Sequence, residues 1–480
     1  MKKIIYSSLL ILCMTLASCG EDFLNRSPIS NMNEVDFYNS ENDMNLAIAA
    51  AYATLHDIYA PHYMLSYYGE LMSDNVYTAN VILGWNDRLQ FQDGNVRADN
   101  NMLHTFWNAY YTSMYRINNV ISRLHEVDDI SNANGYEAEM RFLRALYYFD
   151  LVRAWNNVPI VTTPLSLKEA YATPLSSSED VYKQIIEDLN FAVANLGETP
   201  RQLGAPTIGA ANTLLGKVYL TQGNKTEAAT TLLKVYGKYS LVPYADLWDL
   251  KKKNSAESIF EIQYTGGAGN PYSLYWAYFT PYENGIATAW GYGDNQVSDD
   301  LWDAYEENDI RRDISIYDGY IDEANADTIK DVRFAKKWVD RDAQLDNDRH
   351  EMGDNNFIVL RYADVLLLLT EATGDAKYLN EVRARAELLP YGDVGYPTAK
   401  YNTIELAVEH ERQVEFALEF HRFFDLKRTG RAVEVLKNIK DERKISSVNN
   451  ADLFGSRGLY LPIPLPVLDQ NPILKQNNGY

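Results

Sequence analysis

Two aromatic-rich stretches hold the residues best suited to bind a ligand. Trp85 stands in the sequence GWNDR, directly before Asp87 and Arg88, and Trp290 stands in AWGYGDN, close to Tyr292. A sugar ring presents C–H bonds on one face and hydroxyl groups at its edge. An aromatic plane can therefore hold the face while Asp, Asn or Arg bonds to the edge. These residue types point to non-covalent binding of a polar, ring-shaped ligand.

The expected ligand-binding residues are Asp74, Trp85, Arg88, Trp276, Tyr278, Tyr282, Trp290 and Tyr292. The aromatic rings would stack on the ligand, and Asp74 and Arg88 would bond to its hydroxyl groups. Packing of the rings within their own loops is the alternative. That the two stretches converge on one site is a hypothesis.

Signatures of catalysis and of cofactor binding are missing from the sequence. There is no His-Glu-x-x-His motif, and the seven histidines are scattered without metal-ligand spacing. The run Gly266–Gly269 is not followed by the Lys-Ser/Thr of a phosphate-binding loop, and no G-x-S-x-G motif occurs. An acidic run lacks the glycine and glutamate spacing of an EF-hand, which favours a solvated loop over a calcium site; it comprises Asp340, Asp342, Asp346 and Asp348. We predict no enzyme, no cofactor and no metal site, with a surface glycan hydrolase as an alternative, because Asp and Glu are frequent.

The charge balance excludes a further class of partner. With 66 acidic and 44 basic residues, the chain has a formal net charge of −22. Such a chain repels the phosphates of nucleic acid and the headgroups of an anionic membrane. We therefore expect no nucleic-acid partner.

The N-terminus has the pattern of an export signal. Two lysines precede the apolar run Ile4–Leu16, which is too short to cross a membrane as a mature helix. The sequence Leu-Ala-Ser before Cys19 matches the lipobox of bacterial lipoprotein signal peptides. We predict that residues 1–18 are removed and that Cys19 is acylated, which would anchor the protein to a membrane. The other cysteine is Cys13, so no disulfide can form in the rest of the chain.

The remaining chain is mainly helical in its periodicity. Residues 137–155 carry two apolar rows, which predicts a helix buried on most sides and ending at Asn156-Asn157, before Pro159. Other expected helices lie at 34–58, 102–124, 181–196 and 404–426, and helical order is also expected at 361–386, where 362–386 is a looser hairpin partner.

A helical hairpin at 209–239 has the spacing of a tetratricopeptide repeat. Gly216, Tyr219, Gly223, Ala228 and Leu232 occupy its offsets. Several such hairpins would stack into a superhelix. We therefore predict a mainly α fold of tetratricopeptide-like hairpins with a few short strands.

Two regions break this helical pattern. Residues 59–100 and 255–350 are aromatic and irregular and are expected to form a loop-rich lobe, with one strand at 258–264. The proline-punctuated tail from Leu461 is expected to be extended. We treat residues 19–480 as one binding domain.

Motifs spread along nearly the whole chain resemble one family. They are Cys19 with EDFL at 21–24, FLRA at 142–145, the hairpin at 211–223, RYADVL at 361–366, Glu411-Arg412, Arg422, Asp425-Leu426, Arg428, LPIP at 461–464, and Gly479-Tyr480. In this combination the chain resembles the SusD/RagB family of outer-membrane lipoproteins. Small departures are Gly20 before the acidic residues, Phe420 where the family often has Gly, and Asn478 where Pro is common.

The resemblance implies a non-catalytic surface protein, lipid-anchored in the outer membrane and facing the cell exterior. Its partner would be a SusC-like TonB-dependent transporter, to which it delivers captured oligosaccharide. A RagB-like peptide binder is the alternative. Asp74 and Trp85 lie in the loop region where glycan-binding members place an acid and an aromatic ring, and the resemblance offers them as analogues only.

Overall fold

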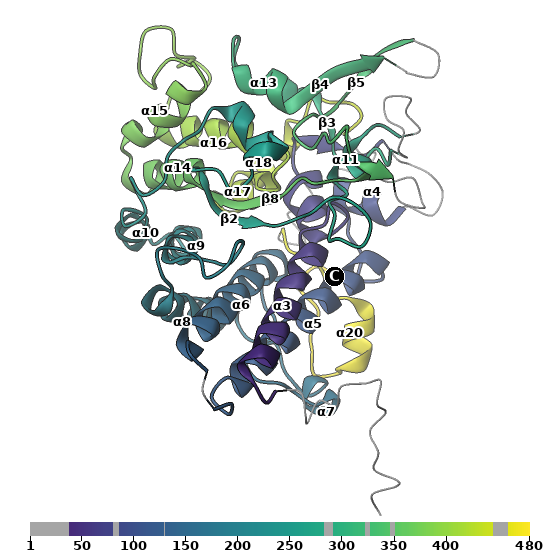
Figure 1. Cartoon of the computed structure of the whole chain (residues 1–480). Helices are drawn as coiled ribbons and strands as arrows, with labels where there is room; N and C mark the ends of the chain where they lie inside the picture. The colour runs from purple at the N-terminus through teal and green to yellow at the C-terminus, as the bar shows by residue number, and fades with distance from the viewer. Residues whose placement is uncertain are drawn as a thin grey trace, which may run out of the picture.

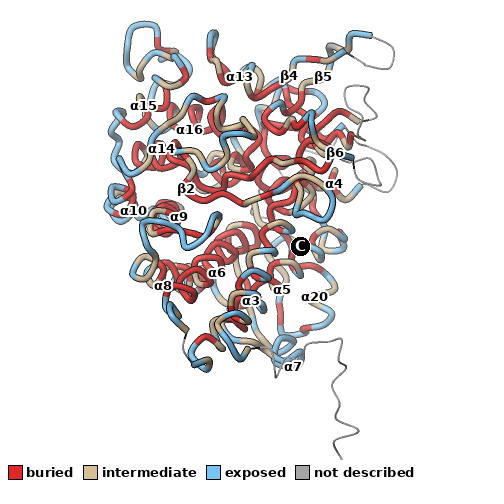
Figure 2. The backbone as a smooth tube through the Cα atoms, viewed as in Figure 1, coloured by how far each residue is buried: buried red, intermediate tan, exposed pale blue. Residues whose placement is uncertain are grey.

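Helix α6 (Ala133–Trp155) lies in the helical half of the structure and is buried along almost its whole length (Figures 1 and 2). The computed structural model describes residues 38–79, 86–128, 130–282, 291–321, 327–345, 351–444 and 459–480. The helix begins after Asn132, whose side-chain oxygen accepts a hydrogen bond from Gly135 N at 3.2 Å. It ends before Asn156, whose φ of 68° takes the backbone out of the helical conformation. The predicted buried helix and its end are confirmed.

The other helices of ten or more residues are α3 (Glu41–Ile58), α5 (Asn101–Arg123), α8 (Ser178–Asn195), α9 (Ile208–Thr221), α14 (Tyr362–Thr373), α15 (Ala376–Arg385) and α16 (Ile404–Glu415). Shorter helices are α4 (Asn86–Gln92), α7 (Leu167–Ala170), α10 (Lys225–Leu232), α11 (Tyr275–Phe279), α12 (Asp299–Trp302), α13 (Ile310–Ser315), α17 (Arg422–Arg428), α18 (Ala432–Lys437) and α20 (Leu465–Gln470). A π-helix, η2, spans Leu65–Leu71. Two 3₁₀ helices follow later in the chain, η3 (Tyr244–Trp248) and η4 (Leu250–Lys252).

Helices stack one after another from α6 onward. Helix α6 packs on α8, α8 on α9, α9 on α10, α10 on α14, and α14 on both α15 and α16. Within the hairpin α9–α10, Gly216 lies so close to Leu232 that an added Cβ would stand 2.5 Å from its Cγ. The predicted tetratricopeptide-like hairpin and the mainly α fold are confirmed.

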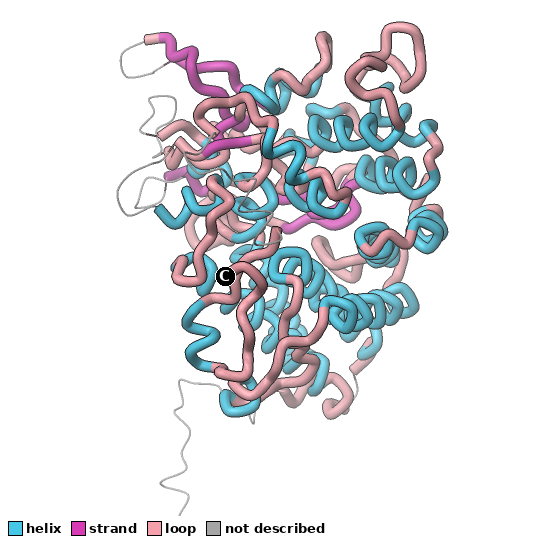
Figure 3. The backbone as a smooth tube through the Cα atoms, turned by 180° about the vertical axis from the view of Figure 1, so that it is seen from behind, coloured by secondary structure: helices cyan, strands magenta, loops and turns pink. Residues whose placement is uncertain are grey.

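Strands form short antiparallel pairs, mostly at one end of the molecule (Figure 3). They are β1 (Val76–Tyr77) with β3 (Gln296–Val297), β2 (Ser258–Ile262) with β8 (Phe357–Arg361), β4 (Ile316–Ile321) with β5 (Thr328–Ala335), and β6 (Gln344–Leu345) with β7 (Glu351–Met352). Strand β2 confirms the predicted strand at 258–264. Its partner β8 was not predicted, because it is wholly buried and lacks alternation.

The predicted helix at 404–426 is wrong in its continuity, because α16 and α17 are separated by a turn. In this turn Leu418 and Phe420 have φ values of 67° and 66°. Phe420 therefore stands in a conformation that glycine adopts readily. Its ring is buried against Phe357, with centroids 5.2 Å apart, which offsets the backbone cost.

The turn between α16 and α17 is held by the buried carboxylate of Glu70 on η2. Its two oxygens accept hydrogen bonds from Leu418 N and Phe420 N, each at 3.1 Å, and Asn75 Nδ2 donates to it at 2.9 Å. Burial is the main cause that raises the pKa of Glu70 from 4.5 to about 7.

The stability of the protein should therefore depend on pH through Glu70. Between pH 4.5 and about 7 the folded chain holds this proton and the unfolded chain does not. The contribution of Glu70 to the free energy of unfolding falls as the pH rises through that window, by roughly 3 kcal/mol. Urea unfolding across this range should show a flatter pH dependence for Glu70→Gln than for the wild type. Parallel curves for the two proteins would contradict the assignment.

Segment 59–100 belongs to the part of the chain expected to form a loop-rich lobe, but most of its described residues are buried and do not form an exposed loop. Every residue of η2 is buried. The tyrosine hydroxyls find partners inside the protein: Tyr67 donates to Asp294 at 3.0 Å, and Tyr68 donates to the Leu459 carbonyl at 2.6 Å. Because each hydroxyl is bonded, burial of these rings carries no unpaired polar group.

The C-terminal segment 459–480 closes over the end of α6. Leu461 N donates to the Ala154 carbonyl at 2.8 Å, and Trp155 Nε1 donates to the Pro462 carbonyl at 2.9 Å. Asn477 Nδ2 donates to the Trp155 carbonyl at 2.9 Å. Helix α20 corrects the prediction that this tail is extended throughout; prolines at its first turn are compatible with a helix start.

The predicted signal peptide and the acylated Cys19 lie outside the described residues. Within the described ranges, no helix combines the length and the apolar character needed to span a bilayer.

Candidate ligand-binding site

The structure brings the two aromatic-rich stretches together. Strand β1 pairs with β3 so that Val76 lies opposite Val297 and Tyr77 opposite Gln296. The pairing continues where Ala79 N donates to the Gly293 carbonyl at 2.9 Å. In Figure 1, α4 and α11 lie near this pair of strands. Trp85 and Trp290 lie outside the described residues, each directly before a described segment that belongs to this site.

Three rings form a stack at this junction, which we call the ring stack: His62, Tyr278 and Tyr292. The rings of Tyr278 and Tyr292 are 4.4 Å apart and inclined by 11°, and those of His62 and Tyr278 are 4.8 Å apart and inclined by 19°. All three residues are partly exposed. The stack therefore combines residues from both stretches in a nearly parallel array at the protein surface.

A buried ion pair lies beside the ring stack. The Arg88 guanidinium is 5.9 Å from the ring centroids of both Tyr278 and Tyr292, and its Nη1 lies 2.8 Å from Asp294 Oδ1. Asp294 also accepts hydrogen bonds from the hydroxyls of Tyr67 at 3.0 Å and Thr78 at 3.3 Å. Burial raises the pKa of Asp294, and the neighbouring guanidinium opposes this shift.

Backbone hydrogen bonds fix Tyr292 against α11. Tyr292 N donates to the Ala277 carbonyl at 3.0 Å, and Asp294 N donates to the Tyr278 carbonyl at 2.9 Å. Between them, Gly293 has a φ of 69°, and an added Cβ would lie 3.1 Å from the Tyr282 Cβ. Glycine is needed here, because a side chain would meet both backbone strain and Tyr282. Tyr282 therefore lies next to the ring stack and is partly exposed.

Two expected ligand-binding residues lie in the interior instead. Asp74 is buried and forms a bidentate pair with Arg422, at 2.8 and 2.9 Å, so both of its oxygens are already bonded. Trp276 is buried against Phe334, with centroids 6.2 Å apart. Burial and these partners separate Asp74 and Trp276 from any surface ligand, which corrects their assignment to the site.

Sequence reasoning missed His62, Tyr67 and Asp294. His62 lies in the first aromatic stretch, and Asp294 follows Tyr292 by two residues, so their positions were a signal. The contacts of Asp294 could not be predicted from the sequence, because its partner Thr78 is 216 residues away along the chain.

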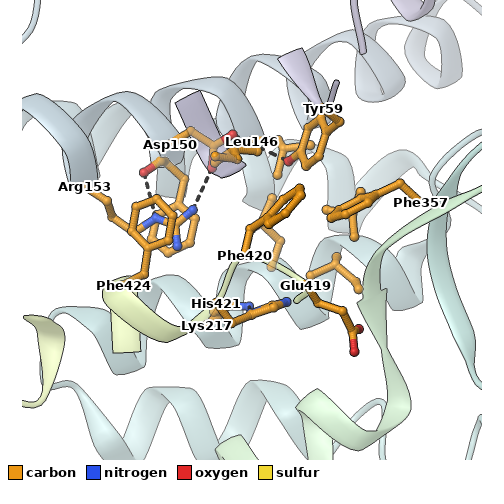
Figure 4. Close-up of a pocket in the computed structure, with 15 residues that line it drawn as sticks. Tyr59, Leu146, Asp150, Arg153, Lys217, Phe357, Glu419, Phe420, His421 and Phe424 are labelled. Atoms are coloured by element: carbon orange, nitrogen blue, oxygen red, sulfur yellow. Dashed lines mark hydrogen bonds and ion pairs between the residues drawn. The ribbon is translucent and has the colours of Figure 1, made fainter. Parts of the chain in front are cut away.

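An internal cavity of about 50 Å³ lies between α6 and the segment Glu419–Phe424 (Figure 4). Its charged lining residues are paired: Asp150 with Arg153 at 2.6 Å, and Lys217 with Asp364 at 2.7 Å. This space suits one or more water molecules and is too small for a sugar ring. It is therefore not a candidate ligand site.

Within the described ranges, no cluster of three or more His, Cys, Asp or Glu side chains has the geometry to hold a metal ion.

Comparison with known proteins gives concordant matches. A family described as "SusD family" matches residues 318–480, and one described as "Starch-binding associating with outer membrane" matches residues 22–220. SusD-like protein P25 of Formosa agariphila is 26% identical over 99% of both chains. A solved structure named "Laminarin binding SusD-like protein" is 28% identical, covers 92% of this chain and 100% of that chain, and has a TM-score of 0.78.

A second solved structure, surface glycan-binding protein A from Bacteroides fluxus, is 25% identical, covers 92% of this chain and 100% of that chain, and has a TM-score of 0.76. These matches extend over the stacked hairpins and the lobe that carries the ring stack. From the family matches at both ends and the shared fold, we conclude that the chain belongs to the SusD/RagB family.

Proposed function

We propose that this protein is a lipid-anchored protein of the outer membrane that captures an extracellular oligosaccharide at the ring stack and delivers it to a TonB-dependent, SusC-like transporter. The observation that carries the proposal is the ring stack itself, with a buried ion pair beside it. A sugar face would lie on Tyr292, and Trp85 and Trp290 would add rings from the adjoining segments.

The comparisons support this ligand class. One matched family is described as starch-binding and associated with the outer membrane, one matched structure is named as laminarin-binding, and another is named as a surface glycan-binding protein. The site is proposed to bind without chemical turnover.

The test is a binding screen of the lipid-free chain, starting after Cys19, against laminarin, soluble starch and a peptide panel. We expect a polysaccharide to bind and Tyr292→Ala and Trp85→Ala each to weaken it by about 1–3 kcal/mol, as measured by calorimetry, because each change removes one stacking plane. Tyr236→Ala is the matched control, since Tyr236 is a partly exposed ring on the distant hairpin side, where it bonds to Glu381.

Unchanged affinity in both site variants would remove the site assignment. Binding confined to peptides would identify a RagB-like peptide binder instead. Cleavage of a bound glycan, abolished by one carboxylate substitution, would identify a hydrolase.

A further inference from the structure

A second cavity, of about 620 Å³, lies beside the middle of α5, between α5, α7 and α20, and we call it the α5 groove. Helices α5 and α20 contact each other, and α7 lies near their lower ends in Figure 1. Its volume falls in the range of about 300–1,000 Å³ that is usual for small-molecule sites. None of the residues assigned to the ring stack lines it.

Aromatic rings from successive turns of one helix form a wall of the α5 groove. Trp107, Tyr111 and Tyr115 are spaced four residues apart and therefore share one face of α5. Tyr111 is fixed by Trp107, whose ring centroid is 5.1 Å away, and by donating its hydroxyl to the Pro159 carbonyl at 3.0 Å. Tyr115 is 43% exposed, which is unusual for a large ring in the described part of the chain.

Helix α7 and the residue that follows it also line the groove, with Leu167, 74% exposed, and Tyr171, 44% exposed. This short helix is held in shape by a capping box between Ser166 and Glu169. Asn471 Nδ2 donates a hydrogen bond to the Thr173 carbonyl at 2.8 Å, and both residues line the groove. The groove lining therefore contains two exposed rings, Tyr115 and Tyr171, on segments that are each held in place.

The polar side chains of the groove are all uncharged. Among the described residues that line it, hydroxyl and amide groups such as Thr112, Asn108 and Gln470 alternate with the rings, and no charged side chain takes part. The uncharged lining of the groove contrasts with the chain as a whole, which has a net charge of −22. A charged ligand would find no counter-charge here, whereas an uncharged one could use both the rings and the amides.

We propose that the α5 groove is a second binding site, for a neutral oligosaccharide. Ring planes would take the C–H faces of the sugar, and the amides and hydroxyls would bond to its edge. The ligand class rests on the proposed function, but the location and the residues do not. An apolar segment of a partner protein fits less well, because the amides would then lose hydrogen bonds on burial.

The experiment uses the lipid-free chain on an array of neutral oligosaccharides (glucans, mannans, galactans and xylans) and uronic-acid oligosaccharides. Binding is compared among the wild type, Tyr115→Ala/Tyr171→Ala, Tyr292→Ala and Tyr236→Ala, and each hit is quantified by calorimetry. Tyr236 is the matched control, as a tyrosine that is 37% exposed outside both sites. Thermal unfolding checks that each variant is folded.

If the proposal holds, the Tyr292→Ala variant still binds a neutral oligosaccharide at the α5 groove. Changing Tyr115 and Tyr171 should weaken this binding roughly tenfold or more, as expected for loss of stacking planes. That result would stand even if the ring stack bound nothing, so failure of the two proposals can be told apart. The proposal is overturned if Tyr115→Ala/Tyr171→Ala leaves every titration unchanged, or if only uronic-acid oligosaccharides depend on these rings. It is also overturned if the double substitution alters only the sedimentation coefficient, which would identify a contact between copies of the chain.

Discussion

Replacing Arg361 with methionine is expected to lower the free energy of unfolding by about 3–5 kcal/mol. Arg361 is buried and forms hydrogen bonds with three carboxylates: Glu419 at 2.9 and 3.0 Å, Glu257 at 2.9 Å, and Glu415 at 2.5 Å. Methionine fills a similar volume, but each of the three buried carboxylates then loses its hydrogen bonds to the guanidinium. Chemical denaturation, followed by circular dichroism, would measure the loss.

The electrostatics of Glu415 support this magnitude. Burial alone would raise the pKa of Glu415, but Arg385, Arg361 and Arg311 together lower it well below its ordinary value. Arg97→Met is the matched control, because Arg97 forms an ion pair with Asp99 at the surface and solvent screens that pair. We expect little change in the control. Equal effects of the two substitutions would show that the buried cluster does not carry stability.

Replacing Arg88 with methionine should have a similarly large effect on stability and should also weaken ligand binding. It leaves the fully buried Asp294 with only the hydroxyls of Tyr67 and Thr78, at a cost of about 3–5 kcal/mol of unfolding free energy. It also removes the cation beside Tyr278 and Tyr292, so affinity for a glycan should fall by about tenfold. Denaturation and calorimetry would measure the two effects.

A double-mutant cycle tests whether the ion pair is responsible. Arg88→Met/Asp294→Asn removes the unpaired charge and should recover much of the lost stability, so the two single changes should not be additive. Recovery of stability without recovery of binding would show that the guanidinium itself supports the ring stack. Additive losses would contradict the coupling between Arg88 and Asp294.

Features set by neighbouring residues could be predicted from the sequence. The C-terminal end of α6 and the fit of Gly216 to Leu232 both depend on residues close along the chain. The turn at Leu418–Phe420 could not be predicted, because its backbone is held by Glu70, 348 and 350 residues away.

The same distinction applies to the site. Tyr278, Arg88 and Tyr292 were found by composition, because aromatic and charged residues in irregular segments are typical of binding loops. Composition could not separate Tyr278 from Trp276, two residues earlier on the same short helix but turned inward. It also could not show that Asp74 is bonded to Arg422, 348 residues along the chain.

The bonds between segment 459–480 and the end of α6 have a consequence for biosynthesis. Because Leu461, Pro462 and Asn477 supply partners of Ala154 and Trp155, the end of α6 gains these hydrogen bonds only after segment 459–480 has been synthesised. A chain synthesised only as far as residue 458 would therefore lack these three bonds at the end of α6.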